Sequence, residues 1–168
     1  MPSVCPARPA DGGAIAAIFN QGIEERIATF ETRPQHAEGW ERWLGSGDEL
    51  VLVAEQDGGV VAWGAAGPYS DRHHYYAGVG EATLYVERSF RRRGIGAKLL
   101  GALAGAAEEQ GMYKLVGKLF TTNEPSIALV HACGFRDVGV HRRHGQLDGD
   151  WRDVLVVERL LGQAAAEA

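Results

Sequence analysis

The sequence predicts a single mixed α/β domain, and three observations lead to that fold class. The chain has 168 residues, which suits one domain with its own core and is short for two. Hydrophobic residues make up 45% of it and charged residues 23%, as in ordinary folded proteins. Helix-like and strand-like segments alternate along it without a repeat, a linker or a low-complexity stretch. We therefore expect one domain over residues 1–168.

The first third of the chain predicts two helices and a hairpin. Asp11 can cap a helix whose apolar residues recur at helical spacing, and the segment ATFETRP ends it. The segment HAEGWERWLGSGD predicts a short helix closed by glycines, with three apolar residues on one face that we expect to be core: Trp40, Trp43 and Leu44. Two strand-like runs then flank Asp57-Gly58-Gly59, which predicts a β-hairpin over residues 50–67.

The remaining elements alternate strand and helix. GEATLYV has a period of two, which places Glu81, Thr83 and Tyr85 on one face of a strand. A helix rich in Leu and Ala is expected over residues 97–110, and the segment YKLVGKLF predicts the next strand. Pro125 suits the first turn of a helix that runs to Cys133, with Gly134 as its C-cap. Two last strands flank the turn GQLDGD, and the tail GQAAAEA is expected to be frayed.

Charge, cysteines and hydropathy exclude several classes of protein. The net charge of −5 argues against a nucleic-acid binder. Cys5 and Cys133 are too few for a disulfide framework or a zinc site, and Cys133, in an apolar run, is expected to be buried. The N-terminus MPSVCPARPADGG has no apolar core, and no apolar run approaches the ~18 residues of a membrane span. We expect a cytoplasmic protein without a metal site.

The stretch SFRRRGIGAKLL, residues 89–100, predicts an anion-binding loop. It lies between a strand that ends near Glu87 and a helix that begins near Gly96. The first amides of a helix point outward without partners, glycines let an anion approach them, and arginines add charge. Pyrophosphate would suit such a cradle, and a solvated basic turn is the alternative. A P-loop and a dinucleotide fingerprint are excluded, because Gly-Lys-Ser/Thr is missing and Leu99 stands where the third glycine would be.

The pattern Arg-x-x-Gly-x-Gly/Ala between a strand and a helix resembles the pyrophosphate loop of the GCN5-related N-acetyltransferases (GNAT), which bind acetyl-CoA. The order of elements is similar, and Asn-Glu-Pro-Ser followed by a helix and Gly-Phe resembles a second motif of that superfamily. The resemblance covers residues 6–160 and implies a mixed, mostly antiparallel central sheet flanked by helices. It also implies that the loop and the second motif bind acetyl-CoA through Val86, Arg91, Arg92, Arg93, Gly94, Ile95, Gly96, Ala97, Asn123 and Ser126.

A narrower group is also similar. ATFETRP, GEATLYV and GDWRDV match the phosphinothricin, methionine sulfoximine and arsinothricin N-acetyltransferases, and HGQLDGDWRDV with CGF looks most like the arsinothricin branch. These enzymes acetylate the α-amine of glutamate-like amino acids. The resemblance therefore implies a resistance enzyme that acts on a small amino acid, and a homodimer with HRRHGQLDGDWRDV near its interface.

Within this resemblance, Glu81 is the expected general base, which must reach the amine directly or through one water. An exposed glutamate on an alternating strand is the alternative. The N–H of Val86 is expected to hold the acetyl carbonyl oxygen, although Val86 also reads as strand core. The family's catalytic histidine is absent, because Val130 stands in its place. His131 lies about 100° round the helix and is expected to be an ordinary helix histidine, with a catalytic role as the alternative.

Further residues match substrate or cofactor positions of the family. The expected substrate-binding residues are Phe30, Arg72, His73, Tyr76, Thr83 and Tyr85. Arginine suits a carboxylate or arsinate, although the loop that carries Arg72 and His73 departs from the phosphinothricin pattern and can be a solvated loop. Phe30 can equally be core, and Asn123 can cap the helix as well as contact CoA. Two alternative functions stay open: acetylation of another small amine or a protein N-terminus, and a non-catalytic acetyl-CoA sensor.

Overall fold

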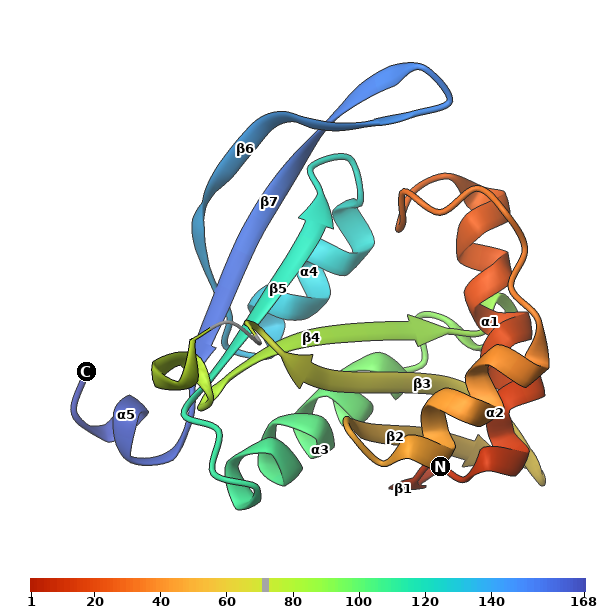
Figure 1. Ribbon diagram of the computed structural model, residues 1–168, viewed down its shortest axis with the longest axis horizontal. Helices are drawn as coiled ribbons and strands as arrows, with labels where there is room; N and C mark the ends of the chain where they lie inside the picture. Colours follow the sequence, from red (N-terminus) through yellow and green to blue (C-terminus); the bar gives the residue numbers. More distant parts are fainter. Residues whose placement is uncertain (71–72) are drawn as a thin grey trace.

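A seven-stranded mixed sheet forms the centre of the computed structural model, which describes residues 1–70 and 73–168 (Figure 1). The strands are β1 Ser3–Pro6, β2 Leu50–Gln56, β3 Gly59–Pro68, β4 Val79–Val86, β5 Lys114–Phe120, β6 Arg136–Leu147 and β7 Asp150–Leu160. The helices are α1 Gly12–Glu25, α2 Ala37–Ser46, α3 Ile95–Glu109, α4 Glu124–Ala132 and α5 Gly162–Ala166. This architecture confirms the predicted fold class.

The strands follow the order β1-β2-β3-β4-β5-β7-β6, and every neighbouring pair is antiparallel except β4 and β5. The parallel pairing of β4 with β5 is short: it runs from Val79 opposite Lys114 to Glu81 opposite Val116. Both strands continue beyond these pairs, and Figure 1 shows them diverging. The sheet is therefore split along its middle, at the level of Glu81.

Helices cover both faces of the sheet. Helix α3 packs on one face, where Leu99 and Leu103 meet Leu52, Ala54 and other buried residues. Helices α1 and α2 cover the other face, where Ile15 and Ile18 pack around Trp63. The alternation along β2 explains this division, because successive side chains of a strand point to opposite faces.

The predicted elements are all present, with several differences in detail. Strand β1 and helix α5 were not expected, and α3 begins at Ile95 rather than residue 97. Cys133, not Gly134, is the C-cap of α4, and Gly134 follows it with a φ of 83°. The prediction of a buried Cys133 was wrong: the thiol is half-buried at the end of α4, and desolvation raises its pKa. Trp40 and Trp43 pack against the α1 core, although both are only half-buried.

Across residues 1–70 and 73–168, none of the helices combines the length and the apolar character that crossing a membrane requires.

Candidate active site

The gap between β4 and β5 exposes backbone groups of β4. Glu87 donates its N–H to Val61, and Val79 accepts from Tyr69, so the odd residues of β4 bond to β3. The backbone groups of Leu84 and Val86 consequently face β5, beyond the last paired residues. A cavity of about 140 Å³ occupies this gap. The N–H of Val86 thus points into the gap, as its expected role as donor to the acetyl carbonyl requires.

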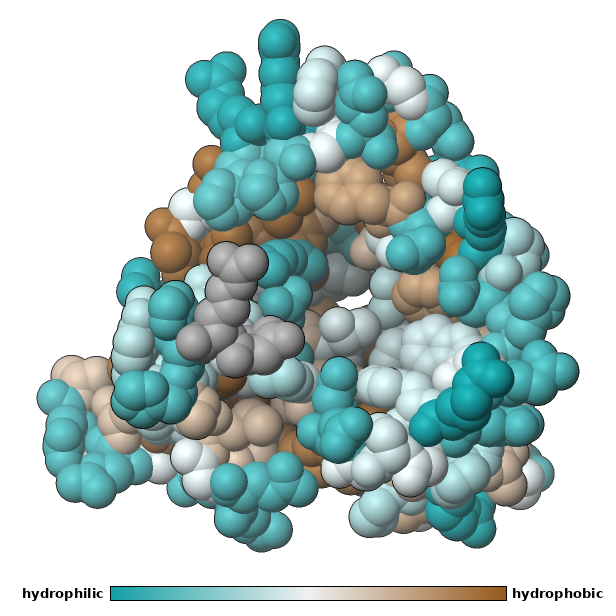
Figure 2. All heavy atoms as spheres, viewed as in Figure 1, coloured by the Kyte–Doolittle hydropathy of each residue, from teal (hydrophilic) through white to brown (hydrophobic). Residues whose placement is uncertain are grey.

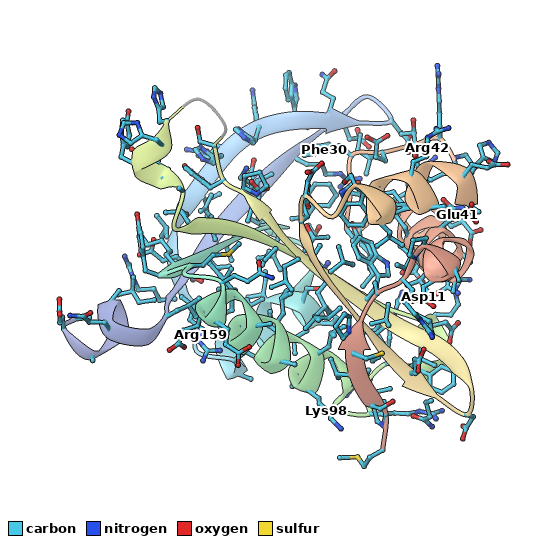
Figure 3. All side chains as sticks on the ribbon, turned by 60° about the horizontal axis from the view of Figure 1, so that its bottom comes forward. Asp11, Phe30, Glu41, Arg42, Lys98 and Arg159 are labelled. Atoms are coloured by element: carbon cyan, nitrogen blue, oxygen red, sulfur yellow. The ribbon has the colours of Figure 1, made fainter. Side chains whose placement is uncertain are left out.

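The predicted anion cradle lies at the start of α3. Arg92 and Gly94 both have positive φ values, 61° and 77°, which turn the chain sharply into the helix. Gly94 is the N-cap and provides no side-chain cap, so the N–H groups of the first helical turn point outward until Lys98 donates to the carbonyl of Gly94. The Lys98 ammonium is used elsewhere: it donates to the carbonyl of Pro2 (Figure 3). An uncapped helix start with such a turn is an anion site.

The three arginines of the loop differ in their contacts. Arg91 donates to Glu25 through Nη1 (2.9 Å) and to the carbonyl of Val86 through Nε (3.1 Å). The guanidinium of Arg93 lies over the ring of Phe90, 5.2 Å from its centroid. Arg92 is exposed, and its side chain makes no hydrogen bond or ion pair with the described residues. Arg91 and Arg93 therefore shape the loop, whereas Arg92 and the backbone face solvent.

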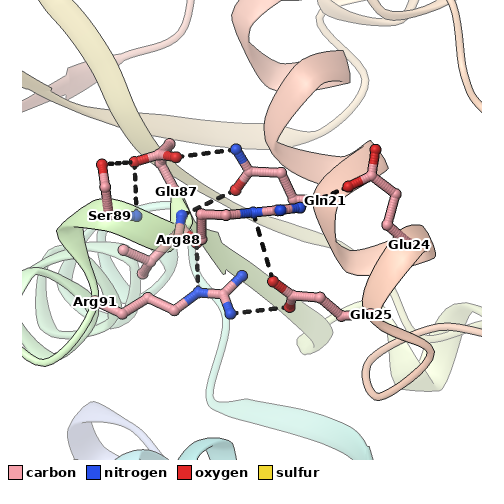
Figure 4. Close-up of polar contacts among 8 residues, drawn as sticks. Gln21, Glu24, Glu25, Glu87, Arg88, Ser89 and Arg91 are labelled. Atoms are coloured by element: carbon pink, nitrogen blue, oxygen red, sulfur yellow. Dashed lines mark hydrogen bonds and ion pairs between the residues drawn. The ribbon is translucent and has the colours of Figure 1, made fainter.

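A polar network fastens this loop to the end of α1 (Figure 4). Gln21 donates to Glu87 at 3.0 Å and accepts from the N–H of Arg88 at 2.9 Å. Arg88 pairs with Glu24 at 2.6 Å. Glu87 also accepts from the N–H and hydroxyl of Ser89, and the hydroxyl bond is the main reason that its pKa lies below the usual value. Helix α1 thus supports the cradle from outside the sheet.

Glu81 lies at the point where β4 and β5 part. Its Oε2 accepts from Nζ of Lys118 on β5, at 3.1 Å. Its side chain lines a second, larger cavity of about 950 Å³ between α2 and the ends of β3 and β4, where Figure 2 shows the surface hollowed. Thr83, two residues along the same face, lines both cavities. The predicted base therefore stands where the two cavities meet.

Tyr85, the third residue of that face, is mostly enclosed. Its ring stacks on Trp63, with centroids 5.2 Å apart and planes at 15°, and meets Phe19 edge-on. Tyr85 also lines the smaller cavity. Burial raises the pKa of Tyr85 to about 12, and the neighbouring Thr29 hydroxyl acts in the opposite direction. This hydroxyl therefore stays protonated at neutral pH.

The other predicted substrate residues lie further away. Phe30 is 38% exposed, so it is not core; it packs edge-on against Phe120 and on Gly145 (Figure 3). His73 stacks on Tyr75, and Tyr76 meets Tyr69 edge-on. Phe30, His73 and Tyr76 are not among the residues that line either cavity. Arg72 lies outside the described residues.

The start of α4 closes the smaller cavity. Asn123 is buried and caps the helix by accepting from the N–H of Ser126, and both line the cavity together with Val130. The cap is as predicted. His131 points elsewhere, since its Nε2 lies 2.7 Å from Asp137 and it does not line the cavity. Val130 stands where the family has its catalytic histidine, so this part of the cavity wall is apolar.

Sequence reasoning missed two residues of the site. Lys118 was read only as part of a strand, although a lysine in the apolar run YKLVGKLF was a visible signal. Glu49 lines the larger cavity, and its carboxylate lies over Gly67, the residue paired with Glu81: an added Cβ at Gly67 would be 2.6 Å from Oε2 of Glu49. No local pattern in the sequence marked Glu49.

The sequence is similar to a family of acetyltransferases and to individual N-acetyltransferases. The model of the acetyltransferase (GNAT) family matches residues 15–135. The phosphinothricin N-acetyltransferase of Streptomyces viridochromogenes is 35% identical over 151 residues, which is 89% of this chain and 82% of that protein. The L-methionine sulfoximine/L-methionine sulfone acetyltransferase of Salmonella typhimurium is 28% identical over 163 residues, 95% of either chain.

The fold of this chain is also similar to solved acetyltransferase structures. The phosphinothricin acetyltransferase of Sinorhizobium meliloti, solved in complex with acetyl-CoA, superposes with a TM-score of 0.90 at 27% identity, over 98% of this chain and 91% of that one. The ribosomal-protein-alanine N-acetyltransferase of Brucella melitensis superposes with a TM-score of 0.89 at 31% identity, over 95% and 99% of the two chains.

Proposed function

Because the chain belongs to the acetyltransferase (GNAT) family and is an N-acetyltransferase with acetyl-CoA as its donor, we propose that it acetylates the α-amine of a glutamate-like amino acid. Phosphinothricin, methionine sulfoximine and arsinothricin are the candidate acceptors, and their acetylation would protect the cell that makes the enzyme. The position of Glu81 carries this proposal: Glu81 lines the larger cavity, on the same strand face as Thr83, which lines both cavities.

The residues present fit acetyl-CoA. The uncapped start of α3 and Arg92 offer donors to the pyrophosphate. The gap between β4 and β5 offers the backbone of Leu84 and Val86 on one side, and Asn123 and Ser126 on the other. When bound, acetyl-CoA supplies an activated acetyl thioester. We therefore assign its pantetheine arm to the smaller cavity and the acceptor to the larger one.

Amine acetylation has three requirements, and residues of this chain meet two of them. Glu81 removes a proton from the acceptor amine, directly or through a water. The N–H of Val86 donates to the acetyl carbonyl oxygen and stabilises the negative charge that develops there. Val130 offers no proton for the departing thiolate, so that proton comes from solvent or from the acceptor nitrogen, which carries a positive charge and a second removable proton once it has attacked the carbonyl.

We also propose a homodimer and a cytoplasmic location. Strand β6 is the edge of the sheet, and Arg136–His144 are exposed along its length. Long exposed edges are usually paired or covered in soluble proteins. Both cysteines are free thiols, which suits a reducing compartment.

Thiol release from acetyl-CoA, measured over a panel of acceptors, tests the function. The panel contains phosphinothricin, methionine sulfoximine, arsinothricin, glutamate, a simple alkylamine and a peptide with an N-terminal alanine. The proposal requires the glutamate analogues to have the highest kcat/KM. Turnover of the peptide alone would favour the second candidate function, which the similarity to the Brucella melitensis protein supports. Acetyl-CoA binding without thiol release from any acceptor would favour a sensor.

A further inference from the structure

An ion pair stands at the junction of the two cavities. Lys118 lines the smaller cavity, Glu81 lines the larger one, and their charged groups lie 3.1 Å apart. Their side chains are 43% and 36% exposed, so both can be reached from solvent. The reacting amine must be placed at this junction, since it lies between the two cavities assigned to donor and acceptor.

The divergence of the two strands explains why Lys118 can reach Glu81. Leu115 and Leu119 point to the core under α3, so Lys118 lies on the opposite face of β5, with Val116. Val116 is the last residue of β5 that pairs with β4, opposite Glu81. Lys118 therefore extends from the part of β5 that has separated from β4, and its side chain reaches back across the opening.

The charges of this pair complement those of an α-amino acid. Such an acceptor carries its ammonium and its carboxylate on one carbon, so the two charges approach a protein together. Resting on the proposed function, we infer that Lys118 binds the α-carboxylate of the acceptor while Glu81 receives the α-amine. Lys118 is thus a specificity-determining residue, which selects free α-amino acids over simple amines and over amino acids with a blocked carboxylate.

Exchange of partners is feasible in this geometry. Ion pairs between exposed side chains are weak, because solvent screens them and ordering both side chains costs entropy. An incoming ammonium and carboxylate replace the single contact between Lys118 and Glu81 by two contacts of the same kind. In the free protein, Lys118 and Glu81 hold each other in place; in the complex, each of them contacts the acceptor instead.

Arg42 is the competing cation. It lies on α2, lines the larger cavity and could bind the same carboxylate (Figure 3). Lys118 is favoured because its ammonium already lies next to the base, as the short distance between amine and carboxylate in an α-amino acid requires. Arg42 is better placed for the distal acidic group of a glutamate analogue, since it lies on the helix that borders this cavity.

Two acceptors that differ only in the α-carboxylate test the inference: the best amino acid of the panel and its α-carboxamide. Kinetics by thiol release and binding by calorimetry, in protein saturated with CoA, are compared for wild type, Lys118→Met, Lys118→Arg and Arg42→Met. In Lys118→Met we expect KM and Kd for the free acid to rise roughly 10- to 100-fold, the worth of a charge-assisted hydrogen bond. Values for the carboxamide should change little, and Lys118→Arg should restore most of the preference.

Other outcomes overturn the inference. Equal losses on both acceptors would show that Lys118 acts only through Glu81 or the fold, and a loss of the acid preference in Arg42→Met alone would assign the carboxylate to Arg42. In both cases the proposed function would stand, because wild type still acetylates the amino acid. A wild-type enzyme that acetylates no amino acid would overturn the proposed function and this inference together. Thermal unfolding at the wild-type temperature confirms that each variant is folded.

Discussion

Nη1 of Arg91 lies 2.9 Å from Glu25, which joins the anion cradle to the last turn of helix α1 (Figure 4). Nε of the same guanidinium donates to the carbonyl of Val86, the residue whose N–H faces the gap between β4 and β5. Arg91 thus links helix, strand and loop. We interpret it as a residue that positions the cradle rather than one that contacts phosphate.

The variants Arg91→Ala and Glu25→Gln should both weaken acetyl-CoA binding modestly. Exposed ion pairs contribute ~0–1 kcal/mol, so calorimetry should show a loss of less than about fivefold for either variant. The double variant should lose little more affinity for acetyl-CoA than Arg91→Ala alone, because the two single changes remove the same ion pair. A loss above about tenfold in Arg91→Ala, with Glu25→Gln normal, would instead indicate direct contact with phosphate.

Gly96→Asp should separate the stability of the protein from its affinity for CoA. A carboxylate in the first turn of α3 stabilises the helix by ~0.3–1 kcal/mol through the dipole, but it repels a pyrophosphate at the same place. The contact of the new Cβ with Leu129 opposes this gain, so we expect a nearly unchanged unfolding temperature together with loss of acetyl-CoA binding by calorimetry.

Gly96→Ala is the control for this variant. Its Cβ would lie 3.0 Å from a terminal methyl of Leu129 and 3.6 Å from Val86, and the Leu129 side chain can shift. The alanine variant should therefore keep most of its CoA affinity. Equal losses of CoA affinity in the two variants would mean that the size of the side chain at residue 96, and not its charge, weakens binding.

Local patterns predicted most of the fold. The hairpin signal Asp57-Gly58 is a turn with φ values of 53° and 81°, and the period of two in β4 places Glu81 and Thr83 on one face. Strand β1 could not be predicted, because it is four residues long, contains Pro6 and is defined only by its pairing with β2. The separation of β4 from β5 likewise depends on packing between distant segments.

The site was predictable where its residues are close in sequence. The cradle and the cap at Asn123 follow from the chain itself, because helix starts have local signatures. The pair of Glu81 with Lys118 spans 37 residues, and that of Arg91 with Glu25 spans 66. One sequence contains no information on such partners, so Lys118 appeared only as a polar residue in an apolar strand.

The pKa of Tyr85 predicts a loss of stability at high pH. Burial raises this pKa to about 12, above the ordinary tyrosine value of about 10. Above pH 10 the hydroxyl ionises in the unfolded chain but stays protonated in the folded one, so the unfolded state is favoured increasingly up to about pH 12. The loss is on the order of 2–3 kcal/mol at most.

Denaturant unfolding of wild type and Tyr85→Phe at pH 8, 10 and 11 measures this effect. The phenylalanine variant should be less sensitive to pH over that range, because it has one fewer group that ionises on unfolding. Parallel pH dependences in the two proteins would contradict the burial of the Tyr85 hydroxyl.

Trp151→Arg should convert the proposed dimer to monomers. Trp151, on β7, is 55% exposed, and Val138 and Val140 on the adjoining edge strand are about as exposed. A charge in the centre of an apolar interface is poorly tolerated, because it is buried without a partner. Sedimentation at micromolar concentration should show a dimer for wild type and a monomer for the variant. A monomeric wild type would contradict the proposed dimer.

Glu81→Gln tests the mechanism itself. Glutamine keeps the shape of the side chain, and its amide oxygen can still accept from Lys118, but it cannot take a proton at neutral pH. We expect kcat to fall by on the order of 10²–10⁴, the usual contribution of a general base. Acetyl-CoA affinity should be unchanged, because the cradle lies beyond the end of β4.

The pH dependence of this variant separates a base from a residue that only shapes the cavity. The loss in kcat should shrink as the pH rises, because more of the acceptor amine arrives unprotonated. A residue that only shapes the cavity would instead raise KM with little change in kcat. Glu109→Gln, an exposed change at the end of α3, serves as the control and should have normal kinetics. Near-normal kcat of Glu81→Gln at neutral pH would reject Glu81 as the base while leaving the family assignment intact.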